Sequence, residues 1–420
     1  MTSVGSRRLH TYPRVVLVVV WAAILINCLG ARGWRGLGGQ LLFPDFLVFY
    51  GAGTLFATDP FSLYDFGRQL SLQQSLIAPT TLPGTGPFVH PPYVAALLQP
   101  LSAFSYGAAL VLWTVLSCAA LCGAIVLLTR SFFDQLASLG LSSGATWVIL
   151  LSVSATVLGL YSGQMHTFIL LGSIAVIVLA LRGHQSAAGL LVGVLAVKPQ
   201  VAFAFGLLFL ASGQWRACVA MAAGFAALNV PLVARVGLDG AATLYADYLE
   251  TARNALSLPL DAGFPRSLLM TPYGLLAVVG SRAHQEAALV VSNVLAGIVL
   301  VQFVIYIRRL HARGPTALRL LFAFATVLPF LVFPYVMLYD SVLLLVAAVL
   351  IPSARPEVRV KTGAFTYAAL WCSAPVSAVL RVPLGGLLAV GLWVRAHGEV
   401  RRLCAGDTAA ADAVDHFSKA

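Results

Sequence analysis

Charge is scarce in this sequence. Charged residues fill 10% of the 420 positions, and only 15 residues are Asp or Glu, whereas soluble domains carry about 25% charged residues. Hydrophobic residues make up 60% of the chain, and the mean hydropathy is +0.90. So few charges cannot cover the surface of a soluble globule. The composition therefore predicts an integral membrane protein.

Cysteine is also scarce, and its placement argues against metal centres and disulfide frameworks. All of the 6 cysteines lie within apolar runs except Cys404, which lies near the end of the chain. Cys118 and Cys122 would share a helix face, but no histidine or second cysteine pair accompanies them at the spacing of a zinc site. We therefore expect neither a bound metal at these thiols nor a disulfide bond.

Two further features are missing. No small-residue cleavage site follows the first apolar run, Val15 to Leu29, so we expect a retained first helix rather than a signal peptide. No internal repeat is evident, which disfavours a transporter or flippase, a class in which repeats are common. That class nevertheless stays open as an alternative, and a non-catalytic membrane scaffold is a second one.

The net charge of +11 comes largely from basic residues at the ends of apolar runs. Arg7, Arg8 and Arg14 precede or open the first run, while Arg401 and Arg402 follow the last. Positive charge beside membrane spans marks their cytoplasmic side, and this pattern explains the charge better than nucleic-acid binding does. We expect a plasma (inner) membrane protein with both termini in the cytoplasm and no nucleic-acid partner.

Apolar runs recur along the chain. A bilayer span takes about 20 apolar residues, which predicts an all-α, polytopic helix bundle of about twelve transmembrane helices. The predicted spans are 14–30, 106–129, 145–161, 164–182, 186–198, 199–213, 216–234, 286–307, 317–336, 338–352, 363–380 and 382–395. The stretches 91–104 and 266–280 are too short or too proline-flanked to cross, so we expect re-entrant or interfacial helices there. Because Lys198-Pro199 divides 186–213, that region is either two spans or one broken helix.

These spans form one predicted membrane domain, 14–395, between a cytoplasmic N-terminus, 1–13, and a cytoplasmic tail, 396–420. The small and polar residues of the tail predict disorder. Two outer loops, 31–92 and 235–265, are too polar for hydrocarbon and too short for a separate soluble domain. We expect them to cap the outer ends of the helices.

Polar residues interrupt the apolar runs at points that this topology brings to the outer face. The first is Asp45, within Phe43-Pro44-Asp45-Phe46. A lone carboxylate beside a bilayer is costly unless it is solvated, paired or used. The other polar residues at this face are His90, Gln164, His166, Lys198, Tyr339 and Asp340.

Each of these residues also has a structural interpretation. Asp45 and Asp340 are suited to cap helices, and Gln164 and His166 to bond free backbone groups at helix ends. His90 precedes two prolines and would shape a turn. The amine of Lys198 would extend to lipid headgroups. Their convergence on one face favours a functional interpretation.

Five short motifs occur in a fixed order along the chain. They are Pro44-Asp45-Phe46 through Tyr50 with Leu63-Tyr64-Asp65, Phe88-Val89-His90-Pro91-Pro92-Tyr93, Gly163-Gln164, Val197-Lys198-Pro199, and Phe333-Pro334-Tyr335 with Tyr339-Asp340. Together they resemble the motifs of glycosyltransferase family 87, α-mannosyltransferase-like membrane enzymes of the GT-C class that depend on polyprenyl-phosphate sugars. His90 stands where that family has an aromatic residue, and His166 where it has asparagine.

The resemblance implies a GT-C fold and transfer of a hexose, with mannose favoured, from a polyprenyl-phosphate-sugar to an acceptor hydroxyl on the outer face, with inversion. It implies that Asp45 is the general base. Lys198, helped by His90 or Arg266, is expected to bind the donor phosphate. The residues expected to bind the sugar or the acceptor are Gln164, His166, Tyr339, Asp340 and Tyr50.

The expected partners are the polyprenyl-phosphate-linked sugar, a glycan or glycolipid acceptor, and the lipid bilayer. Asp45 and Asp340 offer oxygen ligands for a divalent cation, but a lipid phosphate donor does not strictly require one, and we expect no cofactor. A GT-C transferase for another sugar, such as arabinose or an aminosugar, stays open as an alternative because no residue here identifies sugar stereochemistry.

Overall fold

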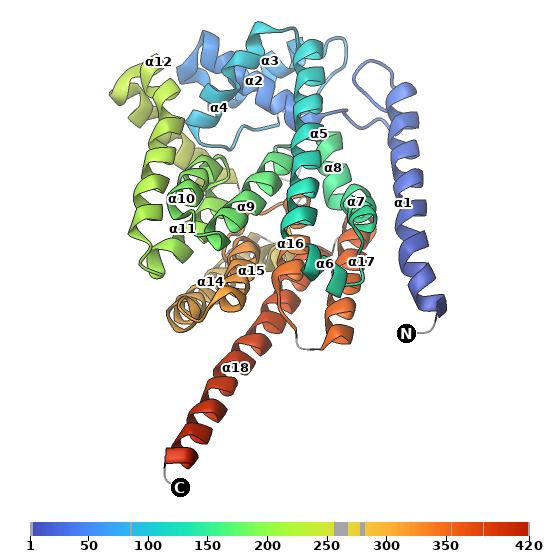
Figure 1. Cartoon of the computed structure of the whole chain (residues 1–420). Coiled ribbons are helices and arrows are strands. Elements are labelled where there is room, and N and C mark those ends of the chain that lie inside the picture. Colours follow the sequence, from blue (N-terminus) through green and yellow to red (C-terminus); the bar gives the residue numbers. More distant parts are fainter. Residues whose placement is uncertain are drawn as a thin grey trace.

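The computed structural model describes residues 3–84, 86–255, 268–277, 282–353, 355–380 and 382–418. Within these ranges the chain forms α-helices, short 3-10 helices and three isolated bridges, but no strand. The all-α fold class predicted from the sequence is therefore confirmed (Figure 1).

Most of the chain lies in helices that follow one another at short intervals. In chain order they are α1 (Ser3–Leu29), α2 (Pro44–Thr58), η1 (Pro60–Ser62), α3 (Phe66–Leu76), α4 (Pro92–Leu98), η2 (Gln99–Ala103), α5 (Tyr106–Ser131), α6 (Phe133–Ser138), α7 (Ser143–Ser152), α8 (Ser154–Ser162), α9 (His166–Leu181), α10 (Gln185–Val194), η3 (Leu195–Val197), α11 (Pro199–Ala211), α12 (Trp215–Ala255), α13 (Pro272–Ala277), α14 (Arg282–Leu310), α15 (Pro315–Val332), η6 (Leu338–Val342), α16 (Leu343–Leu350), α17 (Pro356–Leu380) and α18 (Leu384–Ser418).

Several helices have the length and composition of membrane spans. Within the described ranges they are Thr11–Leu29, Tyr106–Ser131, Trp215–Asn254, Ala283–Leu310 and Pro315–Val332, and the pair α7 and α8, bent by 56°, makes a sixth if it counts as one span. These helices identify the protein as a multi-pass membrane protein. The predicted count of about twelve spans is not confirmed, because four further apolar stretches form helices of only 10–17 residues.

Two of the short apolar helices, α9 and α16, are surrounded largely by protein. Every residue of α16 is buried, and so is most of α9. Broken helices are tolerated at membrane depth where their free backbone groups are buried in protein or line a cavity. The break between α8 and α9 falls at Gly163, and the break before α11 falls at Lys198. Several of the predicted spans therefore correspond to helices shorter than a full crossing.

Segments outside the predicted spans are more helical than expected. Of the predicted outer loop 235–265, residues 235–255 continue α12, which bends at Gly237 and runs on to Ala255, and residues 256–265 lie outside the described residues. The tail, 396–420, was expected to be disordered, yet α18 continues through it to Ser418. Alanine-rich sequence such as Ala409-Ala410-Ala411 has high helix propensity, which accounts for this difference.

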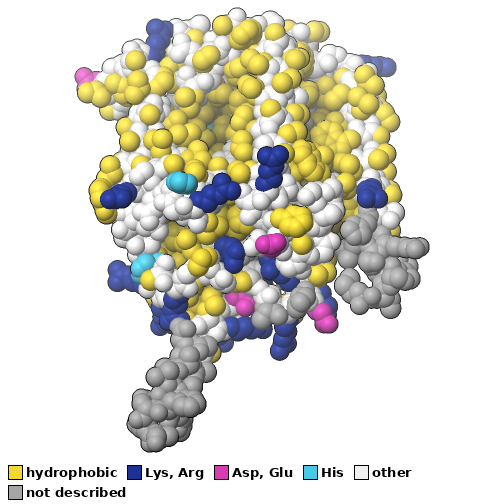
Figure 2. All heavy atoms as spheres, viewed as in Figure 1, with side chains coloured by type: hydrophobic (Ala, Val, Ile, Leu, Met, Phe, Trp, Pro, Cys, Tyr) yellow, Lys and Arg dark blue, Asp and Glu magenta, His cyan; other side chains and the backbone are white. Residues whose placement is uncertain are grey.

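Opposite ends of the molecule differ in charge. α1 begins and α18 ends on one side, whereas α2, α3 and α4 lie on the other (Figure 1). Lys and Arg side chains lie mainly in the lower half of the face shown in Figure 2, while hydrophobic side chains dominate the upper half. Both ends of the chain and most of the positive charge on this face therefore lie away from the α2–α4 cap.

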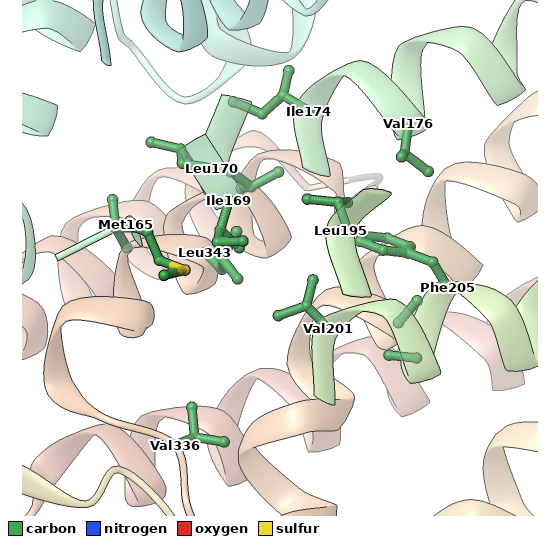
Figure 3. Close-up of a cluster of buried hydrophobic side chains, with 14 of the residues drawn as sticks. Met165, Ile169, Leu170, Ile174, Val176, Leu195, Val201, Phe205, Val336 and Leu343 are labelled. Carbon is green, nitrogen blue, oxygen red and sulfur yellow. The ribbon is translucent and has the colours of Figure 1, made fainter. Parts of the chain in front are cut away.

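A buried apolar core supports the points where the helices break. Figure 3 shows side chains from α9, from the η3–α11 break and from the segment around η6 packed together. Met165 directly follows Gln164, while Leu195 and Val201 lie on either side of Lys198. Close packing of these neighbours holds the backbone of the polar turns in place.

Candidate functional site

Asp45 lies in the first turn of α2. Pro44 occupies the first helical position, where its missing N–H costs nothing, and Phe43 before it has φ 52°, in the left-handed region. A residue other than glycine there costs about 1–3 kcal/mol, and such strain clusters at functional sites. The positive end of the α2 dipole favours the Asp45 carboxylate.

The Asp45 carboxylate accepts hydrogen bonds from the side chains of Ser162 and Gln164. Burial raises its pKa from 3.8 to about 6, although these two hydrogen bonds and the charge of Lys198 lower it; the charge of Asp340 raises it further. Asp45 is therefore ionised at neutral pH but close to its titration range. A carboxylate with that pKa is suited to take up a proton during a reaction.

The Gly163-Gln164 turn brings α8 and α9 directly against α2. Gly163 has φ 77° and ends α8, and a Cβ on it would lie 2.6 Å from Cβ of Phe46. The indole N–H of Trp113 donates to the Gly163 carbonyl at 2.8 Å. Gln164 follows and donates from Nε2 to the hydroxyl of Tyr339 at 2.9 Å. The turn thus links Asp45 on one side to η6 on the other.

Lys198 and Asp340 form a buried ion pair. Each residue is only 3% exposed, and Nζ of Lys198 donates to a carboxylate oxygen of Asp340. The ammonium also lies 4.8 Å from the centre of the Tyr339 ring, within cation–π range. Removing one partner of such a pair leaves an uncompensated buried charge. The pair therefore fixes the α11 start against η6, beside Asp45.

The two predicted histidines both lie within the electrostatic reach of Lys198. The His90 ring contacts Phe49 and Phe88, with ring centres 5.4 and 5.6 Å apart, and burial together with the charge of Lys198 lowers its pKa to about 3. His90 is therefore neutral at physiological pH and offers a hydrogen bond rather than a charge to a ligand. The buried His166 ring packs on Gly159, with its centre 6.5 Å from that of Tyr339.

One predicted residue, Tyr50, does not join the cluster, and another, Arg266, cannot be placed. Tyr50 is buried among aromatic side chains, and its hydroxyl donates to the Phe104 carbonyl at 2.8 Å, so it supports α2 rather than facing Asp45. Arg266 lies outside the described residues. The structure brings together the other predicted site residues, which are Asp45, His90, Gln164, His166, Lys198, Tyr339 and Asp340.

The structure adds two residues that were not predicted. Ser162 bonds the Asp45 carboxylate, and Tyr335 lies close enough to Asp45 and Asp340 that burial and their charges raise its pKa. Ser162 precedes the Gly163-Gln164 motif and Tyr335 lies within the Phe333-Pro334-Tyr335 motif. Proximity in sequence to a motif was therefore the signal that could have identified both.

The close contact at Gly163 leads to a stability prediction. Gly163→Ala forces a left-handed alanine, at about 1–2 kcal/mol, and overpacks Phe46, at about 1–3 kcal/mol more. Gly213→Ala is the matched control, since Gly213 has φ 71° but no atom within 4 Å of the point where a Cβ would lie. We expect the thermal unfolding temperature in detergent to fall further for Gly163→Ala than for Gly213→Ala. Equal decreases would show that α2 does not rest on this turn.

Comparison with known protein families identifies the family of the chain. The family model for glycosyltransferase family 87 matches residues 88–334, more than half of the chain. The matched region contains His90, Gln164, His166 and Lys198, whereas Asp45 precedes it. No curated protein and no solved structure matches the chain. The chain belongs to glycosyltransferase family 87 and is a membrane glycosyltransferase.

Proposed function

We propose that this glycosyltransferase moves a hexose from a polyprenyl-phosphate-sugar to an acceptor hydroxyl, with inversion at the anomeric carbon. The reaction would occur on the outer face of the plasma (inner) membrane, with both termini in the cytoplasm and a glycan or glycolipid as acceptor. The observation that carries the proposal is the group formed by Asp45 and the Lys198–Asp340 pair. It combines a carboxylate of raised pKa with a buried cation near it.

Each member of the group has a role in this reaction. The acceptor oxygen attacks the anomeric carbon as its proton passes to Asp45, and the bond from that carbon to the phosphate oxygen breaks. Lys198 stabilises the negative charge that develops on the leaving phosphate. Neutral His90 would donate a hydrogen bond there. Gln164, His166, Tyr339 and Asp340 would hold the sugar or the acceptor, with Ser162 orienting Asp45.

Mannose is favoured as the sugar by the family resemblance alone. Arabinose or an aminosugar stays within the same chemistry, because Asp45 and Lys198 act at the anomeric centre and the phosphate, which all these donors share. The transporter and scaffold alternatives lose support from the match to a transferase family. Among the described residues, no cluster of polar or charged side chains favours transport or a scaffold role.

The function can be tested with the purified full chain in nanodiscs. Radiolabelled polyprenyl-phosphate-mannose and extracted membrane glycolipids would serve as donor and acceptors. We expect label to enter a glycolipid whose new linkage has the anomeric configuration opposite to that of the donor. Retained configuration would contradict the inverting mechanism. Absence of transfer from this and from other polyprenyl-phosphate sugars would contradict the function itself.

The raised pKa of Asp45 predicts how transfer depends on pH. The carboxylate must be ionised to accept a proton, and its pKa is about 6. We expect kcat to be level above about pH 7 and to fall by about tenfold per pH unit below 6, as the protonated fraction grows. Rates measured between pH 5 and pH 8, corrected for unfolding at each pH, provide the check. A flat profile over this range would exclude Asp45 as the base.

A further inference from the structure

Two large cavities lie beside α1, outside the group of residues around Asp45. The first has a volume of about 770 Å³ and lies between α1, α7 and α17, with Val16, Ile149 and Ala364 in its wall. The second has a volume of about 570 Å³, and Ala23, Val157 and Ala374 line it. Most of the lining side chains are apolar. Neither wall includes Asp45, Lys198 or Asp340.

The two cavities form one groove, here called the α1 groove. Trp371 lines both of them, and successive turns of α1, from Tyr12 to Asn27, follow their length. α1 stands apart from the rest of the bundle (Figure 1), and only 6% of its apolar window is buried. The indole N–H of Trp21 donates to the Leu151 carbonyl at 2.9 Å and ties the helix to α7.

The length of the α1 groove limits what can fill it. The distance from Tyr12 to Asn27 along α1 is about 22 Å at a rise of 1.5 Å per residue. One leaflet of a bilayer core is only about 15 Å thick. The acyl chain of a phospholipid ends near the midplane and would fill part of the groove. A hydrocarbon chain longer than one leaflet would fill all of it.

One end of the α1 groove is polar and lies next to the site. Asn27 and Gln40 line it there with Tyr161, and Asn27 hydrogen-bonds both, at 3.3 Å to the Tyr161 hydroxyl and at 3.0 Å to Gln40. Tyr161 immediately precedes Ser162, which bonds Asp45. The Tyr161 ring also lies 6.3 Å from that of Phe43, two residues before Asp45. A chain leaving this end of the groove therefore arrives beside the reacting groups.

We propose that the α1 groove binds the isoprenoid chain of the lipid-linked donor, with its phosphate at the Asn27 end and its tail toward Tyr12. This inference rests on the proposed function for the identity of the donor. Its physical basis is separate: an apolar groove longer than one leaflet, with polar side chains at the end where Tyr161 precedes Ser162 and lies near Phe43.

Trp371 provides a test that does not depend on catalysis. Bromine atoms quench tryptophan fluorescence on contact, so a polyprenyl phosphate brominated along its chain would report on the groove. In nanodiscs holding the full chain, we expect saturable quenching by this probe, and most of the quenched signal should be missing in Trp371→Phe. The same mole fraction of brominated phosphatidylcholine should quench far less. Equal quenching by the two lipids would show that ordinary bilayer lipid fills the groove and would overturn the proposal.

Substitutions that fill the α1 groove should raise KM in a way that depends on how far they lie from the Asn27 end. Ala364→Trp blocks the cavity near Tyr12, and Ala23→Trp blocks the one near Asn27. We expect Ala364→Trp to raise KM about tenfold for a long-chain donor, because displacing roughly two methylene groups from the groove costs about that much in affinity. KM for a donor with the short citronellyl chain should not change. Ala23→Trp should raise KM for both donors. Ala22→Trp, on the exposed side of α1, is the control. KM values unaffected by donor length in all three variants would overturn the proposal.

The two proposals can fail separately. Asp45→Asn should quench like the wild type while it loses transfer, since Asp45 does not line the groove. Saturable, Trp371-dependent quenching in a wild-type protein that transfers no sugar would support the groove and contradict the function. Sugar transfer by a protein that both brominated lipids quench equally would support the function and overturn the proposal that the α1 groove binds the isoprenoid chain.

Discussion

Asp45→Asn is expected to lower kcat for sugar transfer by about 10²–10⁴-fold, the usual contribution of a general base. The amide has nearly the shape of the carboxylate and still accepts hydrogen bonds from Ser162 and Gln164, so the site should keep its geometry. KM for the donor should change little, because the substitution leaves the Lys198–Asp340 pair in place. Initial rates at saturating donor give the comparison.

The same substitution should stabilise the fold or leave it unchanged. Because the folded pKa of Asp45 is raised from 3.8 to about 6, its stabilising contribution is present at low pH and is lost as pH rises through that interval. At neutral pH the ionised carboxylate then lowers the free energy of unfolding by about 3 kcal/mol. Asparagine has no charge and avoids this cost. If Asp45→Asn loses sugar transfer but unfolds at the same or a higher temperature than the wild type, Asp45 serves catalysis and not stability.

Asp239→Asn is a suitable control for this experiment, because Asp239 is an exposed carboxylate of α12. It should leave both kcat and the unfolding temperature unchanged. If Asp45→Asn and Asp239→Asn transfer sugar at the wild-type rate, Asp45 is a structural cap of α2 and the base lies elsewhere.

Lys198→Met is expected to destabilise the protein by about 3–5 kcal/mol, because it leaves Asp340 charged, buried and without its partner. Asp340→Asn should destabilise it by a similar amount, since it isolates the ammonium instead. The double variant Lys198→Met with Asp340→Asn should recover most of this loss, because no unpaired buried charge is left. Unfolding temperatures of the four proteins, compared as a double-mutant cycle, measure the coupling.

Transfer should not recover with stability in the double variant. If Lys198 binds the donor phosphate, its methionine replacement lacks that contact whether or not Asp340 is charged, and KM for the donor stays high. A double variant with wild-type stability and wild-type KM would show that the pair is only a structural link between α11 and η6. The stability and KM measurements thus separate the two roles of Lys198.

Much of the site could be predicted because polar side chains are rare in this chain. Asp45, Gln164, Lys198 and Asp340 each interrupt an apolar run, and the cost of placing such groups in a membrane protein makes each one informative. The predicted topology placed all four residues at the outer ends of the spans, in short turns, and so predicted that they lie close together. The structure brings these four together, with Lys198 and Asp340 in direct contact.

Other features could not be predicted, for physical reasons. Hydropathy measures how apolar a run is but not whether lipid or protein surrounds it, so α9 and α16 had the same signal as full spans. The supporting position of Tyr50 depends on the Phe104 carbonyl, which is 54 residues away. The α1 groove depends on how far α1 stands from α17, and no local pattern encodes that separation.

The Lys198–Asp340 pair also constrains how the chain is built. The two residues are 142 positions apart, so at about 5–20 residues per second the ribosome makes Lys198 roughly 7–28 s before its partner. During that interval Lys198, at the start of α11, is a cation with no counter-ion from η6. The N-terminal half of the bundle can therefore reach its final packing only after the C-terminal half has inserted, which makes the two halves a single unit of assembly.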